Sequence, residues 1–122
     1  MNVTEFARHV GISPHTIRYY EKIGLLNEVR RLPNGHRFFS DTDARWIRFI
    51  QRLKATNMPL DQIREYAELR AQGDATLSAR QQLLEAHADT LRDNLARQQH
   101  HLDKLNEKIA FYQSVISSKN DA

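Results

Sequence analysis

Cysteine is absent from all 122 residues of the sequence. The chain therefore cannot form a disulfide, a thiolate metal site or a thiol-based redox switch. No apolar run approaches the roughly 20 residues that a membrane-spanning helix needs. The N-terminus also lacks the basic-then-apolar pattern of a signal peptide, so a cytoplasmic location with no membrane partner is the expectation.

Sequence patterns of enzymes are missing as well. We find no nucleophile–base pair, glycine-rich phosphate loop or HExxH spacing. His87, His100 and His101 are the only histidine group that suggests a metal, but adjacent helical residues point about 100° apart and rarely chelate together. A metal shared across a dimer is the alternative to solvated histidines. We therefore expect no catalytic residue, no metal site and no cofactor.

Charge is distributed unevenly along the chain. Residues 1–55 carry ten basic and five acidic residues, a net charge of +5, whereas residues 56–122 carry eight basic and ten acidic residues, a net charge of −2. The basic half is where an anionic partner such as DNA would bind. A solvated basic surface is the alternative.

Residues 11–26 predict a tight turn followed by a short basic helix. Ser13 is a candidate N-cap, Pro14 suits the first helical position, and Gly24 is placed to end the helix. Ile17 and Tyr20 share the buried face. His15, Thr16, Arg18 and Tyr19 then lie on the exposed face. A cation, hydroxyls and hydrogen-bond donors on one face suit a helix that enters a DNA groove.

A shorter helix over residues 3–10 precedes this one, with Thr4 as the expected N-cap and an apolar stripe of Phe6, Ala7 and Val10. Together the two helices predict a helix–turn–helix.

Residues 29–39 predict a small hairpin, or wing. Pro33-Asn34-Gly35 is strong turn chemistry, with Val29 and Phe38-Phe39 as flanking strand material. The cations around the tip are Arg30, Arg31, His36 and Arg37. They suit contact with DNA phosphates. A structural hairpin with a solvated tip is the alternative.

Two further helices are expected over residues 40–57 and 59–71. Ser40 is the N-cap candidate of the first, with Asp41 and Asp43 in its first turn. Its apolar stripe includes Trp46, which we assign to the core. Arg45, Arg48, Arg52 and Lys54 line its polar side. Ile63, Tyr66, Ala67 and Leu69 face inward on the second helix, and residues 73–76 form a short linker.

From Leu77 to about Ile116 the apolar residues follow a heptad repeat, which predicts a coiled coil about 60 Å long. One register collects Leu77, Leu84, Leu91, Gln98, Leu105 and Tyr112, and the other collects Gln81, Ala88, Leu95, Leu102, Ile109 and Ile116. Such a seam needs a partner helix, and the same helix of a second copy is the simplest one.

Three stretches resemble the MerR family of bacterial transcription regulators: TIRYYEKIGLL (16–26), RRLPNGHRFFSDTDARWIRFI (30–50) and MPLDQIRE (58–65), followed by a long helix. The resemblance implies a mainly all-α fold in which a winged helix–turn–helix domain (1–72), a linker (73–76) and an antiparallel coiled-coil helix (77–117) precede a flexible tail (118–122).

The same resemblance implies a homodimer that binds a pseudo-palindromic operator in promoter DNA. The dimer bends and untwists the DNA so that RNA polymerase engages both promoter elements. The DNA-binding residues are then Ser13, His15, Thr16, Arg18, Tyr19, Arg31, Asn34, Gly35, His36 and Arg37, with Arg52 and Lys54 on a second wing. The dimerisation residues are Leu84, Leu91, Leu95, Leu102, Leu105 and Ile109.

The chain departs from the sensing members of this family. It lacks the cysteines of the metal- and redox-sensing members, and it reads Arg52-Leu53-Lys54-Ala55-Thr56 where the aldehyde-responsive subgroup usually has one. About five residues after the long helix cannot form the large domain of the drug-binding members. The rival hypothesis is a coiled-coil interaction module, or a DNA-architectural module without a transcriptional role.

Overall fold

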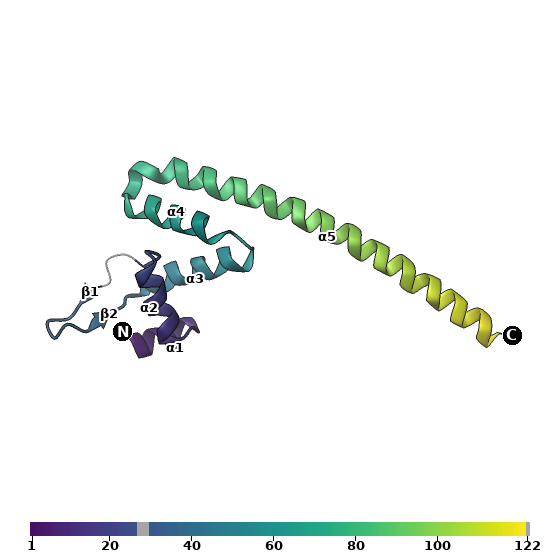
Figure 1. Cartoon of the computed structure of the whole chain (residues 1–122), viewed down its shortest axis with the longest axis horizontal. Coiled ribbons are helices and arrows are strands. Elements are labelled where there is room, and N and C mark those ends of the chain that lie inside the picture. The colour runs from purple at the N-terminus through teal and green to yellow at the C-terminus, as the bar shows by residue number, and fades with distance from the viewer. Residues whose placement is uncertain (27–29, 122) are drawn as a thin grey trace. The chain divides into compact units, whose positions relative to one another are not determined.

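The computed structural model describes residues 1–26 and 30–121. In chain order the elements are α1 (Val3–Val10), α2 (Pro14–Lys22), β1 (Arg30–Arg31), β2 (Arg37–Phe38), α3 (Asp41–Ala55), α4 (Leu60–Ala71), the short 3₁₀ helix η1 (Gly73–Thr76) and α5 (Leu77–Asn120) (Figure 1). The mainly helical fold with a long C-terminal helix is as predicted. Val29 and the side chain of Arg30, both assigned to the wing, lie outside the described residues.

The chain divides into two compact units, Met1–Leu84 and a second one from residue 85 onward. The core of the first unit joins α1, α2, α3 and α4. Its largest fully buried side chains are Phe6, Ile17, Leu25, Phe39, Ile47, Ile50 and Ile63. The rings of Phe6 and Phe39 stack with centroids 4.4 Å apart, which joins α1 to the end of the wing.

Trp46 belongs to this core, as predicted. Its indole N–H donates to the carbonyl of Leu25 at 2.6 Å, so its one polar group is satisfied where the chain leaves α2. Tyr66 of α4 stacks on the indole with ring centroids 5.7 Å apart, and the guanidinium of Arg70 lies 4.3 Å from its centre. Trp46 therefore ties α3 to the C-terminal end of α2 and to α4.

The predicted start and end of α2 are confirmed. The Ser13 hydroxyl accepts from the backbone N–H of Thr16 at 3.1 Å, and Pro14 occupies the first turn. Beyond Lys22, Gly24 has a φ of +86°, a left-handed conformation that glycine adopts without strain. Leu25 and Leu26 then turn into the core as expected.

Two predicted boundaries among the first four helices are wrong. The N-cap of α1 is Asn2 and not Thr4, because the Asn2 side chain accepts from the Glu5 N–H at 2.9 Å and Thr4 already lies in the first turn. The helix α3 ends at Ala55, two residues earlier than expected, because Asn57 has a φ of +65° and breaks the helical path. Asparagine is one of the few side chains that tolerate this conformation.

The capping box of α3 is complete. The Ser40 hydroxyl accepts from the Asp43 N–H at 3.2 Å, and the Asp43 carboxylate accepts from the Ser40 N–H at 2.9 Å. The reciprocal bonds satisfy two backbone donors that would otherwise be free, and they set the point where the wing ends and α3 begins.

The stretch 73–76, which we expected to be a plain linker, is the 3₁₀ helix η1. The Thr76 hydroxyl donates to the carbonyls of Leu69 and Gly73 and so closes the turn between α4 and α5. The helix α5 continues to Asn120, so residues 118–120 are helical and not part of a frayed tail. Within the described ranges, no helix is both long and apolar enough to cross a membrane.

Candidate nucleic-acid interface

The exposed face of α2 presents the residues that the sequence assigned to DNA contact. His15 and Arg18 are exposed, Tyr19 is 46% exposed, and Thr16 is half-buried beside the cap. Arg18 forms no hydrogen bond or ion pair with any residue that the structure describes. Ile17 and Tyr20, on the opposite face, are buried in the core. The helix is therefore anchored on one side while Arg18 faces outward on the other.

Ser13 and Thr16 form a polar pair at the N-terminus of α2. Their hydroxyl oxygens are 2.9 Å apart, in addition to the cap bond from the Thr16 N–H. Both side chains remain at the surface while they cap the N-terminus of α2. An anionic group is favoured at this end by the helix dipole.

The wing is a two-stranded antiparallel hairpin in which Arg31 pairs with Arg37. Its turn is closed by hydrogen bonds from the Leu32 N–H to the His36 carbonyl (2.7 Å) and from the Gly35 N–H to the Leu32 carbonyl (2.8 Å). The Asn34 side chain accepts from the His36 N–H at 3.0 Å, and Gly35 has a φ of +84°. Asn34 and Gly35 thus shape the turn that carries the cations.

Glu21, in the last turn of α2, binds two of the wing arginines. The Nε of Arg37 lies 2.5 Å from one carboxylate oxygen, and Nη2 of Arg31 lies 3.7 Å from the other. Arg31 also donates from Nη1 to the Gly35 carbonyl at 3.0 Å. Sequence reasoning counted Glu21 only as a charge, because its partners lie ten and sixteen residues further along the chain.

An open cavity of about 250 Å³ lies between the wing and the start of α1. Its lining residues are Asn2, Val3, Arg31, Gly35, His36 and Arg37. Three of these six residues, Arg31, His36 and Arg37, are of basic types, so the cavity suits an anionic group such as a phosphate.

The two cations assigned to a second wing differ in their surroundings. Arg52 and Lys54 are both exposed in the last turn of α3. The Lys54 ammonium donates to the Tyr20 hydroxyl at 3.0 Å and lies 5.1 Å from the centre of the Tyr20 ring. Lys54 is therefore held against α2, whereas Arg52 extends from the surface.

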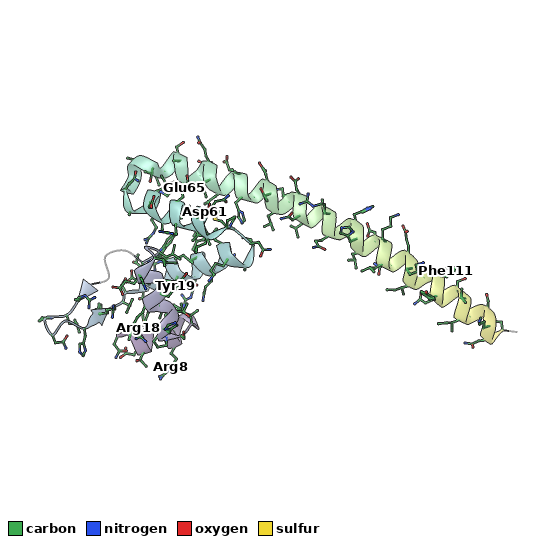
Figure 2. All side chains as sticks on the ribbon, viewed as in Figure 1. Arg8, Arg18, Tyr19, Asp61, Glu65 and Phe111 are labelled. Atoms are coloured by element: carbon green, nitrogen blue, oxygen red, sulfur yellow. The ribbon has the colours of Figure 1, made fainter. Side chains whose placement is uncertain are left out.

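The sequence analysis did not assign Arg8 to the interface. It is exposed in the last turn of α1 and, like Arg18, makes no ion pair within the described part of the chain (Figure 2). The first helix of a helix–turn–helix commonly crosses the DNA backbone. The available signal was a lone cation on the polar side of that helix.

The second unit exposes the predicted seam of α5. Leu95, Leu102, Leu105 and Ile109 are each between 49% and 63% exposed, and no residue of α5 is fully buried. Leu91 is half-buried, and Leu84 packs against the core of the first unit. Among the residues that the structure describes, no group of three or more His, Cys, Asp or Glu side chains could hold a metal ion.

Comparison with known proteins identifies the family. Residues 1–69 match the family described as MerR HTH family regulatory protein, and residues 44–108 match the one described as MerR, DNA binding. An uncharacterized HTH-type transcriptional regulator of Haemophilus influenzae is 40% identical over 107 residues, which cover 88% of this chain and 79% of that protein.

Two solved structures share the fold. The first, HiNmlR, is a MerR family regulator lacking the sensor domain and bound to promoter DNA; it is 38% identical, with a TM-score of 0.81 over 93% of this chain and 90% of that chain. The second is a MerR family transcriptional regulator from Listeria monocytogenes; it is 33% identical, with a TM-score of 0.93 over 99% of this chain and 92% of that chain. This chain belongs to the MerR family of DNA-binding transcription regulators.

Proposed function

We propose that the protein is a homodimer that binds a two-fold pseudo-symmetric operator within a promoter and controls transcription by bending and untwisting that DNA. It acts in the cytoplasm as a binding protein and not as an enzyme, and it influences RNA polymerase through the shape of the promoter. Residues 1–72 form the DNA-binding domain, and the apolar seam of α5 forms the dimer interface. The observation that carries the proposal is Arg18, which is exposed on the anchored helix α2 and has no partner among the residues that the structure describes.

In this proposal α2 enters the major groove. Arg18 and Tyr19 reach base edges or phosphates, while Ser13, His15 and Thr16 lie at the N-terminal end of the helix, which a recognition helix presents to the DNA. The wing contacts the phosphate backbone through Arg31 and His36, and Arg52 and Lys54 supply further phosphate contacts. Arg8 is added to this set.

The exposed seam supports the dimer. The apolar side chains of Leu95, Leu102, Leu105 and Ile109 are exposed to water. Burial of this surface against a second α5 would stabilise the dimer by about 25 cal/mol for each Å² removed from water. Two copies place two recognition helices on half-sites about one helical turn of DNA apart. Distortion of the DNA between them costs a few kcal/mol, which contacts from both copies offset. The neighbour HiNmlR, which is bound to promoter DNA and lacks a sensor domain, supports the same use of this chain.

A nuclease footprint on the DNA around the protein's own gene, at near-physiological salt, tests the proposal. We expect a protected, two-fold symmetric site that overlaps a promoter, with enhanced cleavage at its centre where the DNA is distorted. Binding should weaken steeply as salt rises and retain a large preference for that site. If a genome-wide binding assay also finds no preferred sequence, the interaction-module hypothesis replaces the regulator. A preferred site without any change in transcription indicates an architectural role.

A further inference from the structure

We propose that Glu21 is a positioning residue for DNA binding: it holds the wing against α2 through Arg37, so that Arg31 faces the phosphate backbone. This assignment rests on the proposed function and changes the expected role of one residue. Arg37 then attaches the wing to α2 and does not contact DNA, and Arg31 is the cation that the wing presents to DNA.

The described residues of the wing have few contacts that could fix its direction. Its strands are two residues long, and Leu32 and Phe38 are both more than 40% exposed. Phe39, just after the second strand, is fully buried and shares two backbone hydrogen bonds with Met1, of 2.7 and 2.8 Å. The hairpin is therefore attached firmly at its base, while Leu32 and Phe38, the large apolar side chains among its other described residues, are not buried.

The Glu21–Arg37 pair supplies the missing attachment. The two side chains are only 24% and 30% exposed, and the 2.5 Å contact joins them directly. Such partial shielding from water makes a charge-assisted hydrogen bond stronger than an exposed pair. Because Glu21 lies in the last turn of α2, the bond relates the wing to the recognition helix itself.

Arg31 is held differently. Its side chain is 52% exposed, and its distance of 3.7 Å from Glu21 is too long for a hydrogen bond. The bond from Nη1 to the Gly35 carbonyl limits its rotamers without covering the guanidinium. A side chain held this way loses little further freedom when it meets a phosphate, and such pre-organisation favours binding.

Charge at this site agrees with the assignment. Glu21 alone would repel a phosphate, and the closely bound Arg37 neutralises it. One positive charge remains on the trio of Glu21, Arg31 and Arg37, and Arg31 is its most exposed member.

The test is the affinity of the full-length dimer for its operator and the dependence of that affinity on salt, with four variants. Glu21→Gln and Arg37→Gln should each weaken binding on the order of tenfold, and the double variant should be no weaker than either one. The double variant keeps the net charge of the trio at +1 and should leave the salt slope unchanged. Arg31→Gln should reduce the slope by about two, since each dimer loses two phosphate contacts.

The exchange E21R/R37E is the rescue variant. It restores the ion pair with reversed partners, so we expect it to recover most of the affinity that either single change loses. Thermal unfolding of every variant identifies any that fails to fold. If a single change prevents folding, the exchange still tests the assignment, because it restores the ion pair.

A direct phosphate contact by Arg37 gives the opposite pattern and overturns the assignment. The double variant would then reduce the salt slope by about two, Glu21→Gln would strengthen binding, and the exchange would be the weakest variant. If the unaltered protein binds no specific site, the proposed function itself fails, and that result is distinct from a failure of the wing variants alone.

Discussion

The ammonium of Lys54 donates to the hydroxyl of Tyr20 at 3.0 Å and lies 5.1 Å from the centre of the same ring. Tyr20 is 3% exposed and belongs to the core face of α2, whereas Lys54 stands at the surface in the last turn of α3. The pair therefore joins the two helices that would present the groove contacts and the second set of phosphate contacts. It also holds one cation in a defined position before DNA arrives.

Removal of the Tyr20 hydroxyl should affect both stability and binding. We expect Tyr20→Phe to lower the free energy of unfolding by about 1 kcal/mol, because one hydrogen bond to a charged donor is lost while the ring stays in place. Operator affinity should fall a few-fold, because Lys54 loses its support. Urea unfolding and a binding titration measure the two effects. Unchanged values in both would remove any role for this hydrogen bond.

Lys54→Gln tests the phosphate contact itself. The salt slope of operator binding should decrease by about two per dimer, since each copy loses one phosphate contact. An unchanged slope would limit Lys54 to support of α2.

Arg18→Ala should weaken operator binding by about 1–3 kcal/mol for each half-site and leave the fold intact. The fold should persist because the substitution removes no hydrogen bond or ion pair among the described residues. Arg64→Ala on α4 is the matched control, since Arg64 is also an exposed helical arginine. The prediction is checked by titration on operator and on unrelated DNA. Equal losses for both variants would contradict it.

The seam of α5 gives a prediction about assembly. Replacement of Leu95 and Leu102 by glutamate should dissociate the dimer and abolish specific binding, because two charges would face an apolar partner. The control replaces Ala96 and His100, which lie off the heptad seam, by the same residue. Sedimentation velocity should find monomers for the first variant and dimers for the control. A seam variant that stays dimeric would show that another surface joins the copies.

The capping box gives a prediction about stability alone. Ser40→Ala should lower the free energy of unfolding by about 1 kcal/mol, because the N–H of Asp43 loses its acceptor at the start of α3. Ser78→Ala, at an exposed position near the start of α5, should have a much smaller effect. Denaturant unfolding measures the free energy of unfolding of both variants. An equal decrease in the two would rule out the cap as the cause.

Local chemistry explains which features were predictable. The start of α2 depends on Ser13 and Pro14, which are adjacent, and the start of α3 depends on Ser40 and Asp43, three residues apart. The sequence predicts both starts correctly for that reason. The first N-cap was wrong because Asn2 and Thr4 can both accept the same kind of bond, and nothing local separates them.

Contacts across the chain were not predictable in the same way. Glu21 and Arg37 are sixteen residues apart, and Tyr20 and Lys54 are thirty-four apart, so each pair depends on how the helices pack. The exposed positions of Arg18 and Tyr19 follow from helical periodicity alone. The partners of Arg37 and Lys54 depend on tertiary structure, which periodicity does not reveal.

From residue 85 to residue 120 the helix α5 has no buried residue of its own. If a second copy covers its seam, the stability of this helix depends on the concentration of the protein in the cell. Below the dissociation constant of the dimer, operator occupancy would rise with the square of protein concentration. A twofold change in synthesis of the chain would then change promoter occupancy about fourfold. The protein could in this way respond to its own abundance, with no small molecule required.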